Sequence, residues 1–375
     1  MKQTFHKVLT LSFLTYIGGF FMLQFITPTK TFSELENRNL ATLPDFTMES
    51  FLEGSYGSAF EKYIADQFPG RNSFIAMKSA SEMLLQKTEN NGVYIGDNGH
   101  FFQKFETPDE ELMLKNQDYI SSLAKEKNLY FLLAPTATKV YEEWLPKFAT
   151  PYDEKAYIDT FSQGLDDSVH IVEAYEKLTA HKDEGLYYKT DHHWTTLGAY
   201  YAYDAFCESY GIETLPLESF TRETVTDSFY GSLFSKGNFV FAKPDNMELF
   251  YPKEENPLSV YYVADDRTET SLYEMSHLEK KDKYSVFLDN NHPMIKINTN
   301  IKNGKKLAII KDSYANAVVP FLANHFEEIH ILDLRFLNLS IPDYMTQEGI
   351  EDILMIYNVQ NFSKENKFSL LVPRS

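Results

Sequence analysis

Residues 306–332 of this 375-residue chain read KLAIIKDSYANAVVPFLANHFEEIHIL. The stretch begins with an apolar, strand-like run at 306–311, continues with helical spacing over 314–326 and ends with a second apolar run at 328–332. A strand, a helix and another strand in this order are typical of a parallel sheet with helices packed on its faces. This stretch therefore predicts an α/β fold.

The same alternation extends to both sides of this stretch. Upstream, residues 129–134 form the continuous apolar run expected for a strand covered on both faces, and residues 169–172 form a weaker run. Downstream, a short helical turn at 347–351 precedes a strand at 353–357. The pattern predicts a mostly parallel sheet with helices on both faces.

Capping residues mark two further helices. Thr107 can act as an N-cap, with Pro108 at the first helical position. A second helix is capped by Thr195 or Thr196 and ends at Gly211.

The main domain is predicted to cover residues 91–375, beginning with a hairpin at 91–102. Residues 212–300 lack the strand–helix alternation, and short β-like pieces at 258–263 and 284–288 are separated by charged turns. This region is predicted to be a mostly β and irregular insertion that acts as a lid or substrate-contacting flap.

A lead segment at 30–90 is predicted to be extended at first and then helical. Helical spacing occurs at 51–64 and 74–85. Between these helices, Asp66 and Arg71 are interpreted as a structural ion pair across the turn.

The first 29 residues have the composition of a membrane segment. Residues 8–28 contain no charged side chain and, at about 1.5 Å per residue, reach about 30 Å, enough to span a bilayer. Lys2 and Lys7 precede this run and favour an amino terminus that stays inside. The run lacks an obvious small-x-small cleavage site, so residues 1–29 are interpreted as a signal anchor. A cleaved signal peptide is the alternative.

Composition excludes several classes of function. The formal net charge of −19 argues against a nucleic-acid-binding protein, which needs a basic stripe. Cys207 is the single cysteine, which excludes a disulfide framework and a cysteine metal site within one chain.

The stretch Asp191-His192-His193-Trp194 concentrates groups suited to a catalytic base. Side chains alternate in an extended segment, so Asp191 and His193 point to the same side and His192 to the other. This geometry makes His193 the base and Asp191 the carboxylate that orients it, with His192 as a wall residue or substrate contact. A metal site or a buried histidine that serves only packing are the alternatives.

A candidate nucleophile lies far downstream, at Ser313. It stands at a strand-to-helix turn, which exposes a hydroxyl and aims backbone N–H groups at a developing oxyanion. The alternative is that Asp312 or Ser313 only caps the helix. Additional substrate contacts are expected from Trp194, from Tyr314 and from Lys139 in a loop after the strand at 129–134.

These motifs resemble the DHHW family. The residues that carry the resemblance are Thr190 to Thr195 (TDHHWT), Asp312-Ser313 and the earlier stretch 66–71 (DQFPGR). The family is similar to alginate O-acetyltransferase proteins with an SGNH-hydrolase-like, flavodoxin-like domain. The resemblance implies a circularly permuted motif order, because ordinary SGNH hydrolases place the serine first. Their glycine and asparagine oxyanion blocks are not identifiable in this sequence.

The resemblance also implies a function. Asp191 and His193 match the family's catalytic pair, and Ser313 matches its later serine. The implied reaction is acetyl transfer to an extracellular or cell-envelope polysaccharide, without a cofactor. The acetyl groups would be delivered by a membrane-bound O-acyltransferase, and the catalytic domain would be held outside the cell by its anchor. An SGNH-type carbohydrate esterase and a non-catalytic polysaccharide-binding or envelope-assembly protein are the alternatives.

Overall fold

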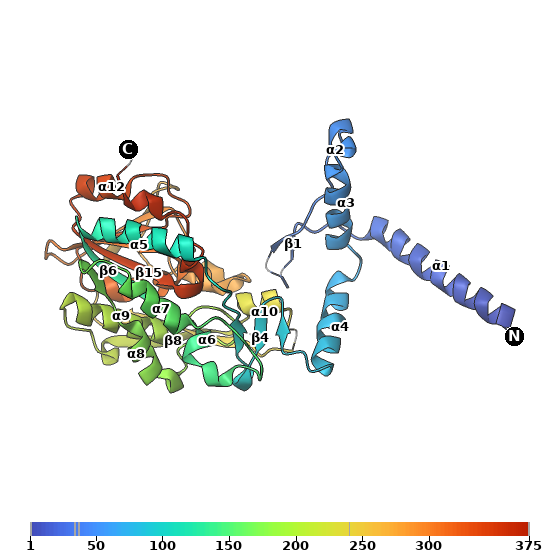
Figure 1. Cartoon of the computed structure of the whole chain (residues 1–375), viewed down its shortest axis with the longest axis horizontal. Helices are drawn as coiled ribbons and strands as arrows, with labels where there is room; N and C mark the ends of the chain where they lie inside the picture. Colours follow the sequence, from blue (N-terminus) through green and yellow to red (C-terminus); the bar gives the residue numbers. More distant parts are fainter. Residues whose placement is uncertain (1, 34, 37, 240, 374–375) are drawn as a thin grey trace. The chain divides into compact units, whose positions relative to one another are not determined.

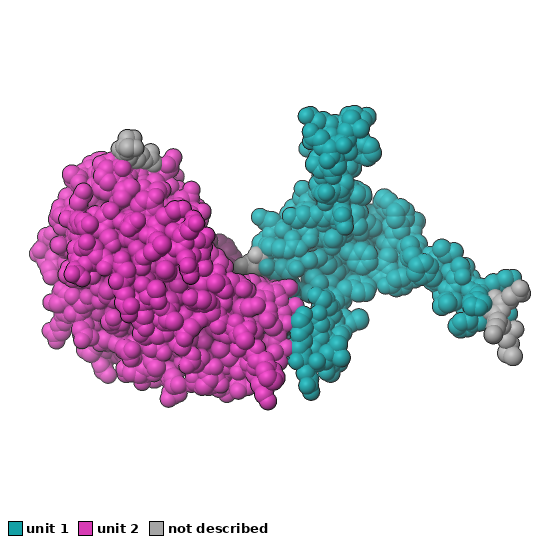
Figure 2. Space-filling view, viewed as in Figure 1, with its two compact units in different colours: residues 1–87, 238–241 teal, residues 88–237, 242–375 magenta. Residues whose placement is uncertain are grey.

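The computed structural model describes residues 2–33, 35–36, 38–239 and 241–373. The chain divides into two compact units (Figure 2). Unit 1 contains residues 1–87 and 238–241, and unit 2 contains residues 88–237 and 242–375.

The core of unit 2 is an eight-stranded mixed sheet (Figure 1). From one edge to the other, its strands are β11 (Arg267–Glu269), β10 (Leu258–Tyr262), β12 (Met294–Thr299), β14 (Glu328–Leu332), β13 (Lys306–Lys311), β15 (Asp352–Asn358), β6 (Asn128–Ala134) and β7 (Val169–Ile171). The strands from β14 to β7 pair in parallel, whereas β11, β10 and β12 are antiparallel and join the sheet through β14. The five parallel strands are those predicted from the apolar runs, so the mostly parallel α/β sheet is confirmed.

Alternate side chains of each strand bury against helices on opposite faces of the sheet. Leu132 and Ile309 pack with α8 (Ala174–Ala180) and α9 (Thr196–Tyr210) on one face. On the other face, strand residues pack with α5 (Glu110–Ala124), α7 (Glu154–Gln163) and α12 (Ile341–Glu348). Figure 1 shows α5 and α12 on one side of the sheet and α8 and α9 on the other. Since parallel strands direct their carboxyl ends to one edge, the residues that follow them gather there.

The region 212–300 contains β-strands and irregular structure, and part of it belongs to the main sheet. Strands β10, β11 and β12 complete the main sheet, and a hairpin is formed by β8 (Phe220–Phe229) and β9 (Asp245–Pro252). The strand predicted at 258–263 is confirmed as β10, whereas the predicted piece at 284–288 is largely the 3₁₀ helix η6 (Lys283–Val286). Pairing between β10 and β12 joins residues 33 to 41 positions apart, which local sequence patterns do not reveal.

Two helices have boundaries different from those predicted. Asp109, not Thr107, caps α5, because its carboxylate accepts two backbone N–H groups of the first turn. The helical turn predicted at 347–351 belongs to α12, which starts after the N-cap Ser340 and ends at Gly349 in a left-handed conformation.

Short elements complete unit 2. They are β3 (Glu89–Asn90), β4 (Val93–Ile95), β5 (Phe101–Gln103), α6 (Ala137–Val140), α10 (Ser232–Gly237), α11 (Val319–Leu322) and α13 (Val359–Phe362). The hairpin predicted at 91–102 is confirmed as β4 and β5.

Unit 1 is built from helices and one short ribbon. Its elements are α1 (Lys2–Ile26), β1 (Phe32–Ser33), β2 (Arg38–Asn39), α2 (Met48–Leu52), α3 (Ser55–Asp66) and α4 (Arg71–Leu84). The segment Thr4–Ile26 of α1 is long and apolar enough to cross a membrane. Of the two lysines that predict its orientation, the Lys2 side chain lies outside the described residues.

The ion pair predicted between Asp66 and Arg71 is part of a larger network. The two Asp66 oxygens accept hydrogen bonds of 3.0 and 2.6 Å from Arg38, while the nearest Arg71 nitrogen is 3.9 Å away. Arg71 instead pairs with Glu36 at 2.6 Å. These contacts fasten the β1–β2 ribbon to the turn between α3 and α4, so their role is structural.

Candidate active site

Ser313 lies two residues after the end of β13, where the chain turns into the 3₁₀ helix η7 (Ser313–Ala317). The continuous helix predicted over 314–326 is instead η7 followed by α11, since Pro320 removes an N–H that a continuous helix would use. The strand is buried on both faces, so it holds the start of this turn rigidly.

Asp312 is the residue that caps this turn. Its Oδ1 accepts the backbone N–H of Tyr314 at 2.9 Å. Its Oδ2 accepts three hydrogen bonds of 2.7 to 3.0 Å, from the backbone and side chain of Asn358 and from the side chain of Asn361. Burial raises the pKa of Asp312, and these donors oppose that effect. With Asp312 as the cap, the Ser313 hydroxyl is available for another partner.

That partner is His193. Its Nε2 lies 2.7 Å from the Ser313 Oγ, and its Nδ1 lies 2.5 Å from the Asp191 Oδ1. When Nδ1 carries the proton, its N–H donates a hydrogen bond to the Asp191 carboxylate. Nε2 then has a free lone pair and accepts a hydrogen bond from the Ser313 hydroxyl. The structure thus brings together three residues that are 120 and two positions apart in the sequence.

The Asp191 carboxylate is built to stay ionised. Burial alone would raise its pKa, but the nearby His193 and His192 and the hydrogen bonds from His193 and Ser232 outweigh burial. Its pKa is therefore held well below the ordinary value. A carboxylate that remains charged can orient the His193 ring and stabilise its protonated form.

The segment Gly231-Ser232 lies against Asp191 and was not identified from the sequence. The Ser232 backbone N–H donates to the Asp191 Oδ2 at 2.6 Å. A Cβ atom on Gly231 would lie 2.2 Å from the Asp191 Cβ and 2.4 Å from its Oδ2, so only glycine fits there. This segment, which we call the aspartate strap, holds the Oδ2 of the carboxylate, whereas His193 bonds its Oδ1.

Aromatic rings fix the imidazole and the serine turn. The Tyr284 ring of η6 stacks on the His193 ring with centroids 3.7 Å apart and planes 6° apart. The Trp194 Nε1–H donates to the Tyr314 carbonyl at 3.0 Å, and the Tyr314 hydroxyl donates to the His192 carbonyl. These bonds tie the histidine segment to the serine turn.

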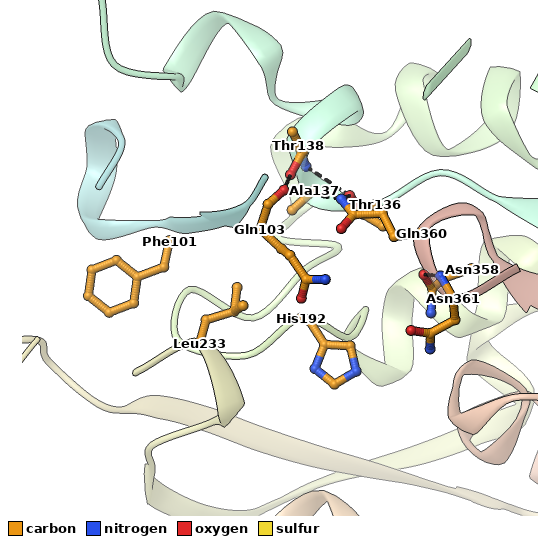
Figure 3. A pocket seen from close by; sticks show the side chains of 10 residues that line it. All are labelled: Phe101, Gln103, Thr136, Ala137, Thr138, His192, Leu233, Asn358, Gln360 and Asn361. Carbon is orange, nitrogen blue, oxygen red and sulfur yellow. Dashed lines mark hydrogen bonds between the residues drawn. The ribbon is translucent and has the colours of Figure 1, made fainter. Parts of the chain in front are cut away.

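The His192 ring packs beside the His193 ring, with centroids 3.8 Å apart, and it lines a small pocket (Figure 3). The prediction that these two side chains point to opposite sides is wrong, because residues 189–193 form bends instead of an extended segment. Its Nδ1 lies 2.6 Å from the Ser232 Oγ. Burial and the nearby His193 lower the pKa of His192 to about 3, so its ring is neutral at pH 7. Ten residues line the pocket: Phe101, Gln103, Thr136, Ala137, Thr138, His192, Leu233, Asn358, Gln360 and Asn361. None of these ten carries a carboxylate, an ammonium or a guanidinium group.

Three of the residues expected to contact substrate, Trp194, Tyr314 and Lys139, do not line the pocket beside His192. Trp194 and Tyr314 have no exposed surface, so they hold the site together and present nothing to a polymer. Lys139 pairs with Glu142 at 2.7 Å and Asp153 at 3.3 Å, and it does not line the pocket beside His192.

A buried charge network beside the serine turn was also missed. The Lys311 Nζ donates to the side-chain oxygens of Asn291 and Asn316 at 2.6 and 2.7 Å, and it lies 3.5 Å from Asp333, which binds Arg335. Burial lowers the pKa of Lys311 to about 8. Lys311, Asp333 and Asn358 end or follow neighbouring parallel strands, and this position was the signal available in the sequence.

Asp191, His192 and His193 also offer potential metal-ligand atoms within 4.8 Å of one another. Each side chain already has a protein partner, however: His193 for Asp191, Ser232 for His192, and Ser313 for His193. A metal ion bound to Asp191 and the Nδ1 of His193 would displace the hydrogen bond between them. The geometry favours proton transfer over metal binding.

Comparison with known proteins places this arrangement in a family. The model of the DHHW family, described as DHHW protein, matches residues 36–131 and 128–332, which together make up most of the chain. The chain belongs to the DHHW family. A DHHW family protein from Eubacterium siraeum is 28% identical, and the match covers 76% of this chain and 95% of that one with a TM-score of 0.66.

Two structures of Bacillus cereus PatB1 share the fold of this DHHW chain. The structure with a sulfonyl adduct is 21% identical and covers 74% of this chain and 98% of the other, with a TM-score of 0.64. The second is 22% identical and covers 72% and 97%, with a TM-score of 0.62. No curated protein matches the chain in sequence.

Proposed function

We propose that this DHHW protein is a membrane-anchored O-acetyltransferase that modifies an extracellular or cell-envelope polysaccharide through an acetyl-serine intermediate. One observation carries the proposal: the hydrogen-bonded series from Ser313 through His193 to Asp191, with separations of 2.7 and 2.5 Å. This is the geometry by which an imidazole activates a serine hydroxyl.

The first half-reaction forms the acetyl-serine. The Nε2 of His193 takes the Ser313 hydroxyl proton while Oγ attacks the acetyl carbonyl carbon. The protonated imidazole, paired with the Asp191 carboxylate, then gives that proton to the leaving group as its bond to the acetyl carbon breaks.

The second half-reaction returns the serine to its starting state. A sugar hydroxyl gives its proton to Nε2, and its oxygen attacks the acetyl-serine carbonyl. The Ser313 oxygen leaves and recovers the proton from His193, so the acetyl group ends on the sugar and the enzyme is unchanged.

The pocket beside His192 is polar but has room for little more than one water molecule, so it does not hold a sugar ring as it stands. The side chains of Asn358 and Asn361 already donate to Asp312, and the Thr136 hydroxyl donates to Glu154. Buried Glu154 holds this wall in place, because it accepts hydrogen bonds from Thr136 and Gln360.

The deciding experiment uses Ser313→Ala in the full chain, with an activated acetyl ester as donor and mass spectrometry as readout. The wild type is expected to gain one acetyl group at Ser313 and to react there with a sulfonyl fluoride. The variant is expected to keep its fold and lose both adducts and turnover.

A matched control separates chemistry from capping. Ser340 caps α12 and is equally buried, so Ser340→Ala measures the loss of a helix cap alone, about 1 kcal/mol. Persistent turnover in a folded Ser313→Ala chain would rule out the acetyl-serine mechanism. If acetyl-serine forms and only water accepts the group when oligosaccharides are offered, the protein is an esterase.

A further inference from the structure

Unit 1 carries an apolar stripe on α4 that its own residues leave uncovered. Phe74, Met77 and Leu84 lie on one side of this helix and are 41%, 63% and 85% exposed, and the neighbouring Leu85 is 82% exposed. Exposure of this many large apolar groups in succession marks a binding surface. We call these four residues the α4 stripe.

An apolar groove adjoins the α4 stripe at Phe74. Its volume is about 610 Å³, and its apolar lining consists of Ile64, Ala65, Phe68, Phe74 and Ile75. Its charged lining residues are Glu61, Arg71 and Lys78. Long side chains such as Lys78 can lie along an apolar surface while their charge reaches water.

The contact between this surface and α1 identifies what covers it. Phe20 of α1 stacks on Phe68 with ring centroids 5.1 Å apart and lies edge-on to Phe74 at 5.8 Å. In Figure 1, the carboxyl-terminal end of α1 lies near the junction of α3 and α4 within unit 1.

Phe20 belongs to the membrane-spanning segment of α1. It is six residues before the last residue of that segment, Ile26, which places it about 9 Å along the helix from its end. Side chains that pack on Phe20 must share its depth when α1 crosses a bilayer. Amphipathic helices that lie in a membrane surface bury their apolar face by about 5–10 Å, the same depth.

We infer that the α4 stripe and its groove are immersed in the lipid leaflet at the carboxyl-terminal end of α1, with acyl chains as the occupant. The inference rests on α1 as a membrane span and is independent of the chemistry at Ser313. A helix held in the leaflet next to the span gives the chain a second attachment to the membrane besides α1.

Depth-dependent quenching in lipid nanodiscs tests this inference with the full chain. Single cysteines are introduced in a Cys207→Ala background and labelled with an environment-sensitive fluorophore. Met77→Cys reports on the α4 stripe, Leu14→Cys on the span, and Leu114→Cys on an exposed site of α5 in unit 2. Circular dichroism confirms that each labelled chain is folded, without relying on any activity at Ser313.

The Met77 label is expected to be quenched most by lipids brominated about 5–10 Å below the phosphates and to resist iodide in the water. The Leu114 label is expected to be quenched by iodide and not by brominated lipids. The Leu14 label is expected to be quenched most by bromines placed deeper in the bilayer. If iodide quenches the Met77 label while the Leu14 label is protected from it, the inference is overturned. The α4 stripe would then be a surface for a membrane-protein partner. A Leu14 label open to iodide would overturn it as well, because α1 would not span.

Discussion

At the scale of single residues, the two adjacent histidines have different surroundings. His193 bridges Asp191 and Ser313, whereas His192 bonds to Ser232 and lines the pocket. One is placed to move a proton and the other to form a wall. This difference is large enough to be measured by substitution.

We expect His193→Ala to lower kcat/KM for an acetyl ester by several powers of ten, as loss of the base in such a triad does. His192→Ala should lower kcat/KM much less, and its main effect should be on the KM of a sugar acceptor. Steady-state kinetics of both variants, with the acetyl ester and with the sugar acceptor, checks these expectations. Equal losses, or the reverse order, would contradict these roles, and bound zinc lost from both variants would favour a metal site.

At the scale of elements, the aspartate strap connects the β8–β9 hairpin to the histidine segment. The strap lies between these two strands in the sequence, yet it supplies an N–H to Asp191. The hairpin therefore influences the site without contributing a reacting atom.

Gly231→Ala tests the aspartate strap. The added Cβ would lie 2.2 Å from the Asp191 Cβ, so the carboxylate must shift away from His193. We expect kcat to fall by about tenfold or more, since a displacement near 1 Å can cost that much. Gly57→Ala, in α3 with open space around it, is the matched control and should leave turnover unchanged. Equal kinetics in the two variants would show that the strap has no role in positioning.

The network around Asp66 makes unit 1 sensitive to acid. The hydrogen bonds from Arg38 lower the pKa of Asp66 from 3.8 to about 2. A carboxylate whose pKa is lowered by folding contributes stability above about pH 4, and that stability is lost as the pH falls towards 2.

Hydrogen exchange of Arg38→Met against the wild type measures this contribution at matched pH. Amides of unit 1 should be better protected in the wild type at pH 5, and the difference should shrink towards pH 2. A difference that stays constant over this range would contradict the assignment to Asp66.

At the scale of the whole molecule, the orientation of α1 in a membrane would decide on which side unit 2 lies. The apolar segment Thr4–Ile26 follows a lysine-containing amino terminus, which favours an amino terminus inside and residues beyond 30 outside. In intact cells, an added protease should therefore digest unit 2. Digestion only after lysis would place the domain inside and contradict an extracellular acetyltransferase.

The sequence alone determined the features that depend on neighbouring residues. Continuous apolar runs predicted the five parallel strands. The contact between Asp191 and His193 was also predicted, but the alternation from which it was argued does not apply, because residues 189–193 form bends and the His192 ring lies 3.8 Å from the His193 ring. The helix after Thr195, with Gly211 in a left-handed conformation at its end, also followed from local rules. The family motifs linked the histidine pair to a serine 120 positions away.

Only the tertiary structure decided which distant groups meet. Four features join residues that are far apart in the chain: the three antiparallel strands of the sheet, the aspartate strap, the Tyr284 ring on His193 and the network around Lys311. It also decided that Asp312 takes the capping role, because its oxygens meet the donors of Asn358 and Asn361 at the end of a neighbouring strand. Such pairings depend on how the strands are ordered in the sheet, and strand order is set by packing of the whole core, which no local pattern encodes.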